Sequence, residues 1–166
     1  MQAYLIFIDK ITKLLEKSSV ETQFQLALEI CKKLYPDYEN FSNKHNFGKP
    51  KVLKEAMDYC EKSFLNKNFN CQSLDLCLKK VVSHAPDTEN HKDWDASYAV
   101  NASASVCELL AYLQDSRVKH ISEICSLMID TVDFKIAEAN EHLSDDGIFN
   151  HPMMVEAMNE IIRKLE

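Results

Sequence analysis

Glycine and proline are scarce in this sequence, with two glycines and four prolines among 166 residues. A β-rich domain needs turn residues about every 8–12 positions, so this scarcity argues against one. Apolar residues make up 46% of the chain, which excludes a disordered or low-complexity protein. These absences leave a helical protein, long enough to bury one sizeable core as a single domain over residues 1–166.

The sequence also lacks segments that would direct it to a membrane or out of the cell. No apolar run approaches the roughly 18 residues of a membrane span. Asp9 and Lys10 interrupt the apolar stretch YLIFI too early for a signal peptide. The six cysteines contain no CxxC pair and are expected as reduced thiols, several of them small buried side chains. We therefore expect a cytoplasmic protein that contacts no membrane.

Motifs of the common enzyme classes are absent as well. Two isolated glycines cannot form a phosphate-binding loop, and no GxSxG, HExxH or Glu-x-x-His pattern occurs. Glu138 and His142 are four residues apart, but no third and fourth metal ligands accompany them. We expect no enzymatic activity, catalytic residue, metal or cofactor, although the sequence leaves a Cys–His nucleophile pair open.

Apolar residues recur with the 3.6-residue period of helices along nearly the whole chain. Helices are predicted over about 3–17, 18–35, 37–45, 50–65, 70–84, 93–114, 116–143 and from 150 onward. Pro36 is expected to end the second of these, because the residue before a proline is pushed away from the α region. The segment 93–114 is rich in small residues and is expected at the centre, with Trp94 more a core anchor than a binding platform. We predict an all-α fold, a single-domain bundle of about six to eight helices.

Acidic residues are concentrated towards the C-terminus. The segment 128–162 carries eight acids and one base, a balance equal to the net charge of −7 of the whole chain. At about 100° per residue, the acids of the helix 116–143 fall opposite its apolar face. A short loop favours the last helix as its antiparallel neighbour, so the two acidic faces can border one surface. That surface is either a solvated face or a binding site for a basic partner, and its field repels nucleic acids.

The partner-binding interpretation leads to a specific function. We expect a non-enzymatic immunity protein, monomeric or homodimeric, that neutralises a basic nuclease toxin domain by filling its positively charged groove. Apolar anchors from the stretch GIFNHPMM would supply the buried centre. The residues predicted to contact this partner are Asp130, Asp133, Glu141, Asp145, Asp146, Phe149 and Glu156.

A second group of side chains supports an alternative. The densest cluster of histidines and carboxylates is His84, Asp87, Glu89, His91, Asp93 and Asp95. A loop followed by a helix start explains these acids without a metal, since acidic side chains stabilise that end of a helix. If the cluster binds a metal instead, the chain is a housekeeping enzyme or regulator.

The stretch CKKLYPDYENFSNKHNFG, residues 31–48, gathers four aromatic residues between a proline and a glycine. We expect a packed structural corner, with a ligand-stacking site as the alternative, made of Tyr35, Pro36, Tyr38, Phe41, Phe47 and Gly48. With Cys31, these residues resemble the hallmark segment of domain-of-unknown-function family 416, small bacterial all-α proteins. The segment 93–110 is similar to that family's small-residue central helix. The resemblance covers about residues 20–143; it implies an all-α fold and carries over no activity.

Overall fold

The computed structural model describes residues 2–140 and 142–166, and the regular structure of this part is entirely helical. Its eight helices are α1 (Gln2–Leu15), α2 (Val20–His45), α3 (Pro50–Leu65), α4 (Cys71–Ser83), α5 (Trp94–Asp115), α6 (Val118–Ala139), α7 (Asp145–Phe149) and α8 (Pro152–Leu165). The predicted all-α fold is therefore confirmed. Within the described residues, no helix is both long and apolar enough to cross a membrane.

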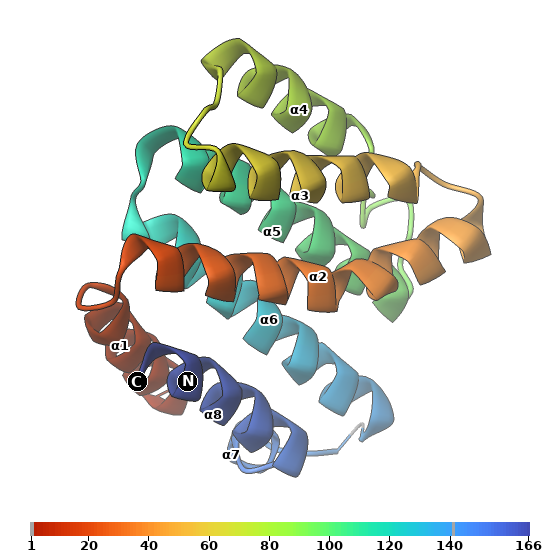
Figure 1. Ribbon diagram of the computed structural model, residues 1–166. Helices are drawn as coiled ribbons and strands as arrows, with labels where there is room; N and C mark the ends of the chain where they lie inside the picture. Colours follow the sequence, from red (N-terminus) through yellow and green to blue (C-terminus); the bar gives the residue numbers. More distant parts are fainter. Residues whose placement is uncertain (1, 141) are drawn as a thin grey trace.

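Helix α2 runs across the middle of the molecule, with α3 and α4 on one side of it and α1, α6 and α8 on the other (Figure 1). Helix α5 packs against α2, α3, α4 and α6, so its predicted central position is correct. Alanines 96, 99 and 102 are buried on it and let the neighbouring helices approach closely. Helices α6 and α8 pack together and run in opposite directions, as predicted (Figure 1).

The prediction that Pro36 ends a helix was wrong, because α2 continues through it to His45. Proline has no amide hydrogen, so the carbonyl oxygen of Lys32, four residues earlier, has no helical donor. Both Pro36 and Lys32 are exposed. Leu34 and Tyr38, on either side of the proline, are buried in the core. Burial of such large side chains outweighs the cost of about 3 kcal/mol of a proline inside a helix.

The helix caps follow local sequence signals. Ser19, rather than the predicted Ser18, caps α2, and its Oγ accepts a hydrogen bond from the Thr22 amide at 3.1 Å. Asn70 caps α4 as predicted, accepting from the amides of Gln72 and Ser73. The helix expected to reach Leu143 instead ends at Ala139, and a separate short helix, α7, follows from Asp145.

The aromatic stretch after Cys31 folds into a packed corner at the end of α2. Tyr38 and Phe41 are fully buried, while Tyr35 and Phe47 are half-buried against the core. The Tyr38 Oη donates a hydrogen bond to the His84 carbonyl oxygen at 2.6 Å. Gly48 has a φ of +63°, and a Cβ added there would lie 2.2 Å from the Tyr38 Oη. Glycine is thus required both by the backbone conformation and by the ring that packs against it.

Trp94 was expected in the core, and this expectation was wrong. Its side chain is 43% exposed at the first residue of α5, with its ring centre 6.0 Å from that of Phe134. The core around α5 is instead filled by residues such as Tyr98 and Tyr112. Tyr112 donates a buried hydrogen bond of 2.7 Å to the Gln23 side chain and thereby links α5 to α2.

Candidate functional site

A hollow of about 330 Å³ lies where α1, α6 and α7 meet, and we call it the acidic hollow. Its lining residues are Tyr4, Asp130, Asp133, Asp145, Ile148 and Phe149. The three carboxylates arrive from two elements, since Asp130 and Asp133 project from α6 and Asp145 begins α7. The Ser144 Oγ caps α7 by accepting a hydrogen bond from the Gly147 amide, which fixes the start of that helix.

The carboxylates of the acidic hollow repel one another. Burial raises the pKa of Asp130, and the charges of Asp133 and Glu123 raise it further. Burial also raises the pKa of Asp133, and so does the charge of Asp145, whereas the positive charge of the chain's amino terminus opposes this rise. No lysine, arginine or histidine side chain among the described residues forms an ion pair with Asp130, Asp133 or Asp145. The hollow therefore carries negative charge that basic side chains of this part of the chain leave uncompensated.

The rest of the hollow is an apolar and aromatic wall. The rings of Tyr4 and Phe149 lie edge to face, with 6.4 Å between their centres. Ile148 and Phe149 are partly buried against the core, so the wall has a fixed position. Carboxylates beside aromatic rings suit a lysine or arginine side chain, because the apolar stem packs on the rings while the charged end meets the acids.

The predicted acidic surface is divided in the structure. Asp130, Asp133, Asp145 and Phe149 come together in the acidic hollow, whereas Asp146 is exposed beside it and does not line it. Glu156 lies on α8 and pairs with Arg163 at 2.7 Å. Glu141 lies outside the described residues. Four of the seven residues predicted for the partner thus share one hollow.

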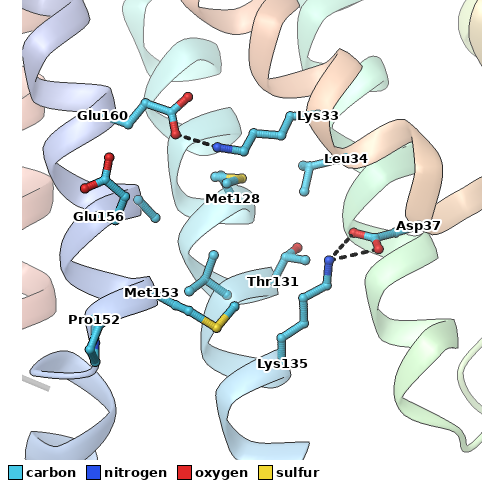
Figure 2. A pocket seen from close by; sticks show the side chains of 12 residues that line it. Lys33, Leu34, Asp37, Met128, Thr131, Lys135, Pro152, Met153, Glu156 and Glu160 are labelled. Carbon is cyan, nitrogen blue, oxygen red and sulfur yellow. Dashed lines mark hydrogen bonds and ion pairs between the residues drawn. The ribbon is translucent and has the colours of Figure 1, made fainter. Parts of the chain in front are cut away.

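Glu156 lines a different cavity, which we call the α2–α6–α8 groove after the helices that form it (Figure 2). The groove has a volume of about 550 Å³ and a largely apolar floor that includes Leu34, Met128 and Val132. Its charged rim is paired within the chain: Lys33 meets Glu160, and Lys135 meets Asp37 at 2.8 Å (Figure 2). Paired charges leave this groove without the net field of the acidic hollow.

The predicted cluster of histidines and carboxylates is only partly assembled. His84 contacts the Lys80 carbonyl oxygen through its Nδ1 at 2.8 Å, at the end of α4. Asp87 accepts hydrogen bonds from the Glu89 amide and the Asn90 side chain in its own turn. Asp93 and Asp95, by contrast, lie close to His45, which is not part of the predicted cluster, and one possible ligand atom from each of the three residues lies within 4.8 Å of the others.

His45 stands in the last turn of α2, and its Nε2 lies 3.1 Å from the Asp95 Oδ2. Lys44 binds the same two acids, with its Nζ 3.3 Å from Asp93 and 2.8 Å from Asp95. These ion pairs hold the pKa of Asp95 below its ordinary value although burial opposes them. The sequence did contain a signal for this position. Phe41 and His45 are four residues apart and so lie on the same face of one helix, which places His45 beside the aromatic corner.

Three of the cysteine thiols are largely buried. Burial raises the pKa of the Cys31 and Cys125 thiols to about 12 and that of Cys107 to about 11. Such thiols stay protonated and are poor nucleophiles. These three cysteines therefore do not support the Cys–His pair that the sequence left open.

Comparisons with known proteins give a family and a fold. The family model described as "Protein of unknown function (DUF416)" matches residues 10–166. The uncharacterized protein YjaG of Escherichia coli K12 is 22% identical over 125 residues, which are 74% of this chain and 63% of that protein. YjaG of Salmonella typhimurium LT2 is 21% identical with the same coverage. A crystal structure of a DUF416 family protein from Shewanella baltica OS155 matches with a TM-score of 0.81 and 25% identity, over 93% of this chain and 81% of that one.

Proposed function

Because this chain belongs to the DUF416 family of proteins of unknown function, we propose a function from its geometry: it is a non-enzymatic binding protein that receives a basic protein in the acidic hollow. The resemblance of residues 31–48 to that family, which the match over residues 10–166 bears out, carries no activity with it. The proposal therefore depends on the chemistry of the hollow alone.

The observation that carries the proposal is that no basic side chain among the described residues forms an ion pair with any of the three clustered carboxylates. Elsewhere on the described surface, acids commonly meet a base of this chain, as Glu61 meets Lys32 and Glu29 meets Lys164. In the hollow, Asp130 and Asp133 are partly buried, and the ionised form of each is disfavoured by burial and by a neighbouring carboxylate, Asp133 for Asp130 and Asp145 for Asp133. A cationic side chain from another protein would relieve that repulsion, and its apolar stem would cover the rings of Tyr4 and Phe149.

The partner's chemistry follows from this arrangement. It presents a lysine or an arginine that enters the hollow, with further basic residues around it that meet the exposed Asp146. Arginine suits the site better than lysine, because its planar guanidinium binds carboxylates through two parallel hydrogen bonds and also stacks on aromatic rings. A basic nuclease toxin domain has this character, and the immunity role remains our prediction for the class of partner.

The proposal is tested by reversing the charge of the hollow. The purified wild-type chain and the double variant Asp130→Lys/Asp133→Lys serve as baits in a quantitative pull-down from the source cells. A double variant with the same charge change, Asp58→Lys/Asp75→Lys, is the control, since these two acids lie on α3 and α4. Proteins held by the wild type and the control but not by the reversed hollow are then produced and titrated by calorimetry. We expect the reversed hollow to bind about a hundredfold more weakly, with binding by the wild type weakening as salt rises.

Two outcomes would contradict the proposal. A partner that binds the reversed hollow as tightly as the wild type does not use these carboxylates. Equal losses in the reversed hollow and in the control would show that only total charge matters. For the immunity role, the toxin domain is co-expressed with each variant: wild type and control protect the cells, and the reversed hollow does not.

A further inference from the structure

The junction between the end of α2 and the start of α5 holds a second site, which the proposed function does not use. His45 is in the last turn of α2, Asp93 is the N-cap residue of α5, and Asp95 is in its first turn. One donor atom from each of these residues lies within 4.8 Å of the others. An imidazole nitrogen and two carboxylate oxygens thus converge from two helices that the fold holds in place.

The Asp95 carboxylate has one oxygen without a partner among the described residues. The Asp95 Oδ1 is buried and accepts no hydrogen bond, whereas the Asp95 Oδ2 faces both His45 and Lys44. Buried carboxylate oxygens in proteins nearly always have a donor or a cation beside them. The Asp95 carboxylate thus has acceptor capacity that its described neighbours do not fill, and its other oxygen, Oδ2, lies beside the imidazole of His45 in a group that includes the Asp93 carboxylate. A cation fits such a group of donor atoms.

We propose that His45, Asp93 and Asp95 form a binding site for a divalent transition-metal cation, with Zn²⁺ as the best match. Nitrogen and oxygen donors of these types are the ligands that Zn²⁺ takes from proteins, together with water. Three protein ligands leave coordination positions open. A hollow of about 380 Å³ adjoins the site and is lined by Lys44, Lys92, Asp93, Trp94, Asp95 and Glu138, so a water or a small ligand has access to the ion.

The surroundings of the ligands are ordered. The His45 ring packs on Phe41, with 4.5 Å between ring centres, and on His91, with 5.1 Å. Because Phe41 is fully buried, it fixes the direction of the imidazole. His45 and Asp95 have side chains that are only 19% and 22% exposed, which limits their alternative rotamers. Ligand side chains that are already held in place lose less conformational entropy when a metal binds.

Lys44 gives the proposal a distinctive consequence. Its ammonium bridges Asp93 and Asp95 and supplies the positive charge that a metal would otherwise bring. The Lys44 side chain is 58% exposed, so it can swing into solvent when a metal displaces it. Removal of this competitor, in the variant Lys44→Ala, should therefore tighten metal binding by about threefold to tenfold, the combined effect of two exposed ion pairs.

The test uses the full chain after treatment with a chelator and dialysis. Calorimetric titration with Zn²⁺ should show one ion per chain, and Co²⁺ should give the visible absorption of a protein-bound ion. Asp95→Asn and His45→Gln should each weaken Zn²⁺ binding at least about tenfold. Circular dichroism confirms that each variant is folded.

The control is His120→Gln. His120 also lies between two acids, Glu108 and Asp115, but it reaches them through different ring nitrogens, Nδ1 and Nε2, so these three groups do not converge on one point. This variant should bind Zn²⁺ like the wild type. The proposal is overturned if the wild type binds no Zn²⁺ at a concentration of about 1 mM, because a dissociation constant above that value means negligible affinity. It is also overturned if Asp95→Asn and His45→Gln bind Zn²⁺ as tightly as the wild type, or if Lys44→Ala binds it more weakly.

Discussion

The aromatic corner at residues 35–48 and the acidic hollow both combine aromatic rings with polar groups, but they differ in whether the polar groups have partners within the chain. In the corner, the polar atoms find partners within the chain: the Tyr38 Oη binds the His84 carbonyl oxygen, and the Ser42 Oγ binds that of Phe47. In the hollow, an aromatic pair, Tyr4 and Phe149, stands beside carboxylates that no described base neutralises. The polar atoms of the corner are thus paired within the chain, whereas the carboxylates of the hollow have no ion-pair partner among the described side chains.

This difference separates a structural motif from a candidate binding site. Contacts completed within the chain stabilise the fold, so changes to them lower stability. Carboxylates that repel one another lower stability themselves, and proteins often retain such unfavourable groups where function needs them. Substitutions in the corner and in the hollow should therefore change the free energy of unfolding in opposite directions.

The largest effect is expected from Tyr38→Ala. Tyr38 is fully buried, and its removal leaves a cavity and an unpaired His84 carbonyl oxygen. The free energy of unfolding should fall by about 3–5 kcal/mol in urea denaturation, as for other large core truncations. Tyr35→Ala, three residues earlier on the same helix and only half-buried, is the control and should lose far less. A Tyr38→Ala protein with the midpoint of the wild type would show that the corner is no structural element.

A smaller loss is expected from Gly48→Ala. The added Cβ would meet the Tyr38 Oη at 2.2 Å, and alanine is strained at a φ of +63°. Strain of this kind costs on the order of 1–3 kcal/mol. In a Tyr38→Phe background the hydroxyl is gone, so the same substitution should cost less. If the two losses add with no coupling in a double-mutant cycle, the close approach of Gly48 and Tyr38 is not energetically important.

How far the sequence predicts this molecule depends on the distance between the residues involved. The helical class follows from local periodicity, and the Asn70 cap from a signal within one turn. Pro36 was misjudged because local rules treat a proline without its surroundings, whereas its exposed position and the burial of Tyr38 decide the outcome. Trp94 was misjudged for the same reason: its size favours the core, but its place at the start of α5 leaves it half in solvent.

The candidate sites were predicted in part. The acids of the C-terminal region stand out in the composition, yet their division between the acidic hollow and the α2–α6–α8 groove depends on how α8 packs on α6. His45 was missed because Asp95, its partner, is 50 residues away along the chain. Periodicity assigns a residue to a helix face but does not give the neighbour that this face meets.

The smallest effect, and the one of opposite sign, is expected from Asp130→Asn. Because burial and Asp133 raise the pKa of folded Asp130 above its ordinary 3.8, the folded chain binds this proton more tightly than the unfolded chain. The wild type therefore loses stability as the pH rises from about the pKa of Asp130 in the unfolded chain through its higher pKa in the folded chain. Asparagine carries no such charge, so the variant should gain stability at pH 7, by less than about 1 kcal/mol because solvent screens the site.

Measuring the stability of Asp130→Asn and of the wild type at two pH values makes this prediction specific. The gain of Asp130→Asn over the wild type should be present at pH 7 and should disappear below the ordinary carboxyl pKa, where the wild-type side chain is protonated in both states. Asp37→Asn is the matched control, since it removes the same charge but from a carboxylate that Lys135 binds at 2.8 Å. That variant should lose stability at pH 7, because it leaves the Lys135 ammonium without its partner. If both variants shift the unfolding midpoint in the same direction, then the presence or absence of an internal base does not distinguish the acidic hollow from the rest of the molecule.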